Sequence, residues 1–186
     1  MKNKKTLIIG LAAGIAVLGI VAAFAFGNGQ GEAMDVAAKR DGRPDPDAVY
    51  IEMPSTALAG ALNGTPETQA AAKQAFDQIN AIRANNGLGA YVWNSGLESA
   101  AGVRAVEAVN KWSHDRPDGT EYWTVNPALV YGENLAKGYF GADAAVQGWM
   151  NSPTHKANIL DAEFKTAAIN IHVSGGDWYW AEEFGY

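Results

Sequence analysis

The sequence contains no cysteine and only three histidines among its 186 residues. Without cysteine the chain forms no disulfide bond, no thiolate metal site and no lipid anchor attached through a thiol. Its stability must therefore come from packing alone. The three histidines are informative because histidine is the side chain whose charge changes near neutral pH.

Basic residues are also scarce, with 14 lysines and arginines against 20 aspartates and glutamates, for a formal net charge of −6. Eight of the basic residues lie between positions 67 and 186, where they form no run. An acidic chain without a basic patch is a poor ligand for a polyanion. We therefore expect no nucleic-acid partner.

The first 26 residues predict an export signal. Residues 1–5 are basic, and residues 6–26 are uncharged and rich in leucine, isoleucine, valine and alanine, a stretch long enough to span a bilayer. We expect a signal anchor, with a signal peptide cleaved at Ala23-Phe24-Ala25 as the alternative. Lysines before the span and an acidic stretch after it predict a C-terminus outside the cytoplasm, held at the cell membrane or secreted.

Residues 27–66 are rich in glycine, proline, alanine and aspartate and show no sustained apolar periodicity, which predicts a flexible linker. The alternative is a small subdomain around residues 49–53, an isolated apolar run. With 48% hydrophobic residues, the chain can bury one sizeable core, so we expect residues 67–186 to form one domain.

The pattern of that domain predicts an α+β fold. A helix should begin at Pro66 with Thr65 as its N-cap and end near Gly87. Two further helices are expected at residues 95–111 and 142–150. Alternating apolar residues predict a strand at 167–173, and residues 178–184 should return as its antiparallel partner. Helices before and between short strands favour a layered α+β domain.

Three segments in the second half concentrate the polar residues of interest. They read WSHDRPDG (112–119), YGENLAKG (131–138) and WMNSPTHKANIL (149–160), and they contain His114, Glu133 and His155. Rare titratable residues among glycine, proline and asparagine suggest loops that converge on one site.

Five other titratable residues are expected to lie outside that site. His172 shares a strand face with Asn170 and should face solvent. Only one of Glu182 and Glu183 should point inward, because consecutive residues of a strand point to opposite faces. Aspartate is an ordinary turn residue, which accounts for the remaining two, Asp115 and Asp118.

The three segments, together with Trp93-Asn94 and the closing YWAEEFG, resemble the CAP superfamily of cysteine-rich secretory, antigen-five and pathogenesis-related proteins. The resemblance is to its bacterial, cysteine-free SCP-like form and covers residues 67–186. It implies a three-layer α-β-α sandwich, which periodicity alone does not show. It leaves the function open, because this fold serves several biochemical roles.

The resemblance also implies roles for the polar residues. In this family the histidine at the position of His114 lines a central cleft, the glutamate at Glu133 lies against it, and His155 is the second cleft histidine. Two neutral imidazoles facing one cavity are suitable ligands for zinc or another divalent cation, with Glu133 orienting a ring. They could equally act as an acid and base pair. The alternatives are a histidine stabilised by a helix C-terminus and a glutamate in a structural salt bridge.

One departure from the family weakens the case for catalysis. Eukaryotic members of the family often carry a second glutamate three residues after the tryptophan that corresponds to Trp149, and here that position is Ser152. The sequence also lacks a recognisable serine or cysteine nucleophile motif. We therefore expect a binding or interaction module of the cell envelope for a small apolar, lipid or cell-wall ligand. The alternatives are a metal-assisted, protease-like hydrolase and a structural envelope protein with a vestigial cleft.

Overall fold

The computed structural model describes residues 31–34, 37–40 and 64–186. The predicted leader, most of the predicted linker and the apolar run at 49–53 lie outside the described residues. Within the described part, no helix has the length and apolar character needed to cross a membrane.

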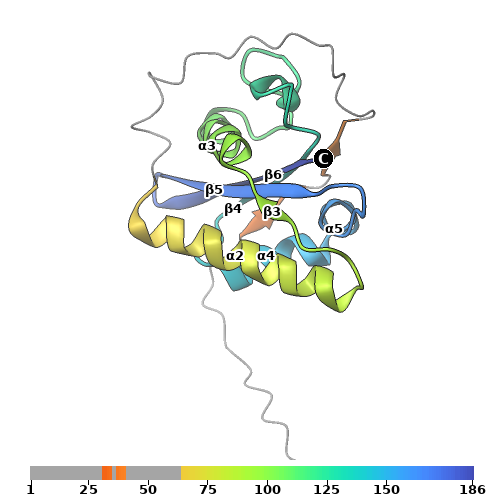
Figure 1. The fold of residues 1–186 in the computed structure, drawn as a ribbon. Helices are drawn as coiled ribbons and strands as arrows, with labels where there is room; N and C mark the ends of the chain where they lie inside the picture. Colours follow the sequence, from red (N-terminus) through yellow and green to blue (C-terminus); the bar gives the residue numbers. More distant parts are fainter. Residues whose placement is uncertain (1–30, 35–36, 41–63) are drawn as a thin grey trace, which may run out of the picture.

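A mixed sheet lies between two layers of helix (Figure 1). One face is covered by α3 (Ser95–Asn110). The other is covered by α2 (Pro66–Asn85), α4 (Ala142–Asn151) and α5 (Pro153–Ile159), and a short 3₁₀ helix, η2 (Tyr122–Val125), follows α3. The architecture confirms the α-β-α sandwich.

The strand order in the sheet is β1-β4-β6-β5-β3, with β2 also paired to β4. The strands are β1 (Glu32–Ala33), β2 (Ala38–Lys39), β3 (Val92–Trp93), β4 (Gly132–Lys137), β5 (Thr166–Ser174) and β6 (Asp177–Gly185). All pairs are antiparallel except β3 with β5. Gly175 and Gly176 make the β5–β6 turn with φ of 61° and 91°, a conformation that favours glycine.

Capping residues set where the two long helices begin. The Thr65 hydroxyl accepts from the Thr68 backbone N–H at 3.3 Å, and Pro66 occupies the first turn. The Asn94 side chain accepts from Gly96 and Leu97 at 2.8 and 3.1 Å. The predicted start of α2 is confirmed, and the Trp93-Asn94 pair marks the end of β3 and the cap of α3.

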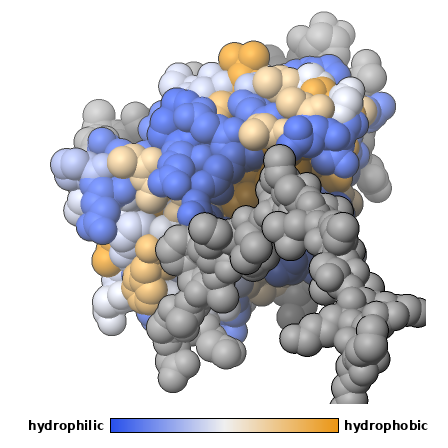
Figure 2. Space-filling view, turned by 90° about the horizontal axis from the view of Figure 1, so that it is seen from below, coloured by the Kyte–Doolittle hydropathy of each residue, from blue (hydrophilic) through white to orange (hydrophobic). Residues whose placement is uncertain are grey.

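Each helical layer packs on the sheet through a different kind of side chain. On the α2 side the core is aromatic, with Trp149 and Trp180 fully buried and edge to face at 6.1 Å between ring centroids. On the α3 side Ala101 and Ala105 pack on β4 and β6 within a small apolar cluster, where their small size lets the helix approach closely. The outer surface on the α2 and α4 side is mainly hydrophilic, with scattered hydrophobic residues (Figure 2).

The sequence prediction did not include β4, α5, β1 or β2. Strand β4 is buried on both faces over five of its six residues, so it lacks the alternation that marks a half-exposed strand. Helix α5 begins at Pro153, which occupies a first-turn position where proline is tolerated. Strands β1 and β2, which fall in the predicted linker, pair with β4 at the edge of the sheet.

Candidate functional site

Glu133 is a fully buried carboxylate on the α3 side of β4. Arg104 of α3, also fully buried, donates to both of its oxygens: Nε to Oε2 at 2.6 Å and Nη2 to Oε1 at 3.1 Å. A buried charge is tolerated only when it is paired and hydrogen-bonded, and a two-point contact between guanidinium and carboxylate provides both.

His114 lies in the loop that follows α3, with 15% of its side chain exposed. Its Nδ1 is 2.6 Å from Glu133 Oε1. Burial by itself raises the pKa of Glu133, but the hydrogen bond with His114 and the charge of Arg104 together bring it below the usual value. Because Glu133 is ionised, its carboxylate accepts from His114 and so fixes the ring orientation and tautomer.

Arg104 also positions the loop that carries His114. Its Nη2 donates to the Ser113 carbonyl at 2.8 Å, and its Nη1 donates to Glu107 Oε2 at 2.7 Å. Glu107 in turn accepts from Arg116 at 2.8 Å. The result is a chain of alternating charges that ties α3 to the loop and to β4.

His155 enters the same region from α5, on the other side of β4, and is fully buried. Its Nδ1 is 2.7 Å from the Ser152 hydroxyl, and its Nε2 has no hydrogen-bond partner in the described part of the chain. Burial, and to a smaller extent the nearby His114, lower the pKa of His155 to about 4. The ring is therefore neutral at physiological pH.

The three residues that the sequence predicts to converge, His114, Glu133 and His155, form two groups in the structure. His114 and Glu133 are directly hydrogen-bonded, and His155 lies close enough to His114 to interact electrostatically without sharing a bond with Glu133. The Ser152 hydroxyl contacts the second imidazole, that of His155. No group of three or more histidine, cysteine, aspartate or glutamate side chains that could hold a metal ion occurs among the described residues.

The prediction that only one of Glu182 and Glu183 points inward is wrong, because both are fully buried. They point to opposite faces of β6, as strand geometry requires, but helices cover both faces. Burial raises the pKa of Glu182 to about 8, although Asn134 Nδ2 donates to it at 3.0 Å. Burial and the adjacent Glu133 likewise raise the pKa of Glu183 well above its usual value.

The remaining titratable residues lie outside the site. Asp115 is exposed and pairs with Lys111, and Asp118 accepts from Thr120 in an exposed turn. His172 is half-buried on β5 opposite Tyr179. Arg104 lies on the buried, alanine-rich face of α3, and an arginine on such a face is the sequence signal that could have identified the partner of Glu133.

Comparison with known proteins gives the family. The family model "CAP: Cysteine-rich secretory protein family" matches residues 76–184. Among curated relatives, the uncharacterized membrane protein YlbC of Bacillus subtilis is 27% identical over 109 residues, 53% of this chain and 31% of the relative. The uncharacterized protein YkwD of the same species is 28% identical over 119 residues, 57% of this chain and 44% of the relative. The matched regions thus span less than half the length of either relative.

Solved structures agree on the architecture. An extracellular protein containing a SCP domain from Bacillus anthracis is 26% identical with a TM-score of 0.55, over 67% of this chain and 45% of that one. An outer surface protein from Borrelia burgdorferi is 20% identical with a TM-score of 0.57, over 63% of this chain and 93% of that one, and supports the fold alone. The chain belongs to the CAP family of cysteine-rich secretory proteins, although it contains no cysteine.

Proposed function

We propose that this protein is an extracytoplasmic binding module whose ligand occupies the site formed by His114, Glu133 and His155. The observation that carries the proposal is the Nε2 atom of His155, a buried polar atom without a hydrogen-bond partner among the described residues. Leaving such an atom unpaired costs about 1 to 3 kcal/mol. A ligand that pairs with it recovers part of that free energy.

The location outside the cytoplasm is supported by the basic and apolar leader and by the relatives. One relative is called a membrane protein and one solved structure an extracellular protein. The ligand we propose is a small apolar, lipid or cell-wall molecule with one polar group. That group would contact His155, and the rest would lie against the neighbouring apolar side chains.

Zinc or another divalent cation is a candidate companion of this ligand. The neutral ring of His155 is in the protonation state that a metal requires, and His114 lies nearby. Two imidazoles are fewer protein ligands than a closed zinc site has, so water or the ligand itself would complete the coordination. A bound cation would supply a positive charge that holds an anionic or carbonyl group, while Glu133 would orient His114.

A hydrolase reading receives less support from the same geometry. Arg104 and His114 occupy both oxygens of Glu133 and lower its pKa, which makes this carboxylate a weak general base. Its arrangement fits a residue that orients an imidazole better than one that removes a proton from water.

Thermal unfolding of the full chain tests the proposal. Melting curves are recorded with excess zinc, with lipids and with cell-wall fragments, for the wild type and for His155→Ala. A ligand at a hundredfold excess over its dissociation constant adds about 2.7 kcal/mol, or a few degrees in melting temperature. We expect at least one addition to stabilise the wild type but not the variant. Equal stabilisation of both, or no stabilisation by any addition, would contradict the proposal.

A further inference from the structure

The outer edge of β5 is paired over only a small part of its length. Strand β3 contributes two residues, Val92 and Trp93, which pair with Thr166 and Ala167. The chain then leaves the sheet to begin α3. From Ala168 onward, β5 has no strand on this side within the described part of the chain.

The hydrogen bonds at either end of this stretch show which backbone groups face outward. The Ala167 carbonyl accepts from Asn94 N at 3.3 Å, on the β3 side. The Ile171 N–H is capped by the side chain of its neighbour Asn170 at 2.8 Å, as expected for a donor without a strand partner. Backbone groups alternate in direction along a strand, so Ile169, midway between Ala167 and Ile171, directs its N–H and C=O outward as well.

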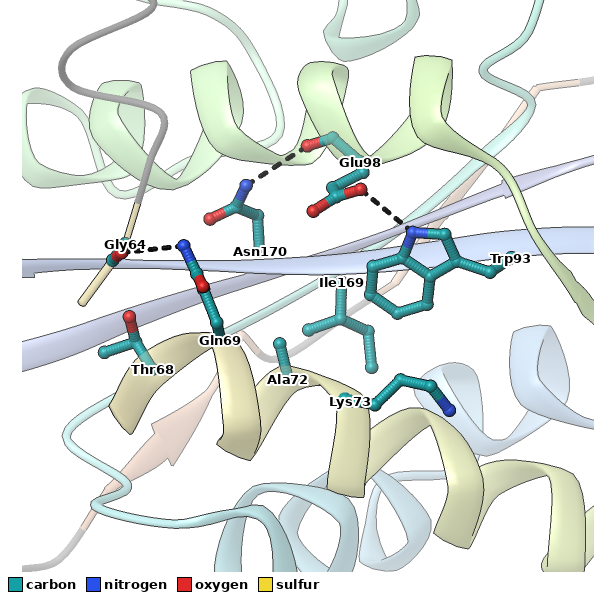
Figure 3. Close-up of a pocket in the computed structure, with 9 residues that line it drawn as sticks. All are labelled: Gly64, Thr68, Gln69, Ala72, Lys73, Trp93, Glu98, Ile169 and Asn170. Carbon is teal, nitrogen blue, oxygen red and sulfur yellow. Dashed lines mark hydrogen bonds between the residues drawn. The ribbon is translucent and has the colours of Figure 1, made fainter. Parts of the chain in front are cut away.

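A cavity of about 470 Å³ lies in front of these groups (Figure 3). Its floor is Ile169 and Asn170, one wall is the α3 residue Glu98, and Trp93 stands at one end. The opposite wall is the first turns of α2, with Thr68, Gln69, Ala72 and Lys73.

The far end of the cavity is closed by Gly64. Gln69 Nε2 donates to its carbonyl at 2.9 Å, and a Cβ at Gly64 would lie 3.4 Å from the Ile171 carbonyl. The accessible edge therefore runs from Ala168 to Ile171. At about 3.3 Å per residue this is roughly 13 Å, the length of about four extended residues.

We propose that this groove binds an extended peptide segment of another protein. The peptide adds to β5 as a strand, on the same edge as β3 and beyond the end of β3. The incoming backbone exchanges two hydrogen bonds with Ile169. A peptide group is the ligand chemistry that presents a donor and an acceptor at the spacing of a strand, and addition to a free sheet edge is a known mode of peptide recognition. This proposal is independent of the histidine site.

The walls of the groove indicate which side chains the peptide carries. Alternate side chains of an added strand point toward α2 and toward α3. On the α2 side they meet Ala72 and the side chain of Ile169, which suit a small apolar residue. On the α3 side they meet Glu98, which accepts from Trp93 Nε1 at 2.9 Å, and this carboxylate favours a polar or basic residue.

The test uses the full chain and the capped peptide acetyl-Val-Lys-Val-Thr-amide. Amide hydrogen exchange followed by NMR should show the Ile169 N–H protected about tenfold or more at saturation. Methylating the peptide nitrogen that pairs with Ile169 should weaken binding about tenfold, because it removes one backbone hydrogen bond. Equal binding of the methylated and unmethylated peptides would overturn the proposal. No binding to the full chain would overturn it too.

Two protein variants provide a matched pair. Ile169→Pro removes the outward N–H without removing a β5–β6 bond, and it should abolish binding. Val173→Pro makes the same change farther along the same edge, beyond Gly64, and should leave binding unchanged. Loss of binding in both, or in neither, would contradict the assignment. If Ile169→Pro fails to fold, the methylated peptide on the wild type still decides the question.

Discussion

Glu133 and Glu182 lie on opposite faces of the β4–β6 strand pair and are buried equally deeply, but they are held in opposite charge states. On the α3 face, Glu133 is ionised because Arg104 and His114 contact it. On the α2 face, Glu182 has a neutral amide donor, and burial raises its pKa to about 8. Both side chains are fully buried, so their difference in charge comes from their hydrogen-bonding partners and not from their depth of burial.

The largest effect should come from removing the cation of the α3 face. Arg104→Met leaves the Glu133 carboxylate buried without its guanidinium partner, and breaking a buried pair in this way costs about 3 to 5 kcal/mol. Urea unfolding at pH 7 should show the loss. The double variant Arg104→Met with Glu133→Gln should recover much of it, since no charge is then left unpaired. If Arg104→Met is as stable as the wild type, then the charge of Arg104 is not what distinguishes the α3 face from the α2 face.

Glu182 on the α2 face should make the stability of the protein depend on pH. The folded state keeps Glu182 protonated up to a pKa of about 8, whereas the unfolded chain loses that proton near 4.5. The folded state therefore binds more protons between these values, and its stability falls as pH rises. Glu182→Gln should remove this dependence and stabilise the protein by about 3 kcal/mol more at pH 8 than at pH 5.

The control for that prediction is Glu107→Gln on α3, because Glu107 is a partly exposed carboxylate already paired with Arg104 and Arg116. It should not become more stabilising as pH rises. If Glu182→Gln shows the same pH profile as Glu107→Gln, then Glu182 is not held protonated by burial.

The two faces also show which features could be predicted from the sequence and which could not. Capping residues predicted the start of α2, and the motif resemblance predicted the contact between His114 and Glu133. Local sequence could not show that helices cover both sides of β6, and for that reason Glu182 and Glu183 were not both expected to be buried. The same double coverage removed the alternation from β4.

The partner of Glu133 was missed for a related reason. Arg104 lies 29 residues upstream on a face of small alanines, and only the packing of α3 on β4 brings the two together. Ser152, in contrast, was recognised as a departure from the family, but only the structure shows that its hydroxyl contacts His155.

A smaller effect is expected at Ser152. Ser152→Ala removes the hydroxyl that contacts His155 Nδ1 and leaves a second nitrogen of that buried ring without a partner. We expect a loss of about 1 to 2 kcal/mol, smaller than the effects of Arg104 and Glu182. Thermal unfolding measures it, and Ser174→Ala, at the end of β5, serves as a control that should change stability little. Equal losses in the two variants would show that the Ser152 contact does not support the site.

The most direct test of the central claim observes the His155 ring itself. Nitrogen NMR of the three histidine side chains, recorded with and without zinc at neutral pH, reports which ring nitrogen gains a partner. We predict that His155 Nε2 and the ring of His114 shift on addition of zinc, while His172 is unchanged. Unchanged resonances of His114 and His155, or a shift confined to His172, would contradict the proposal that zinc binds at these two rings.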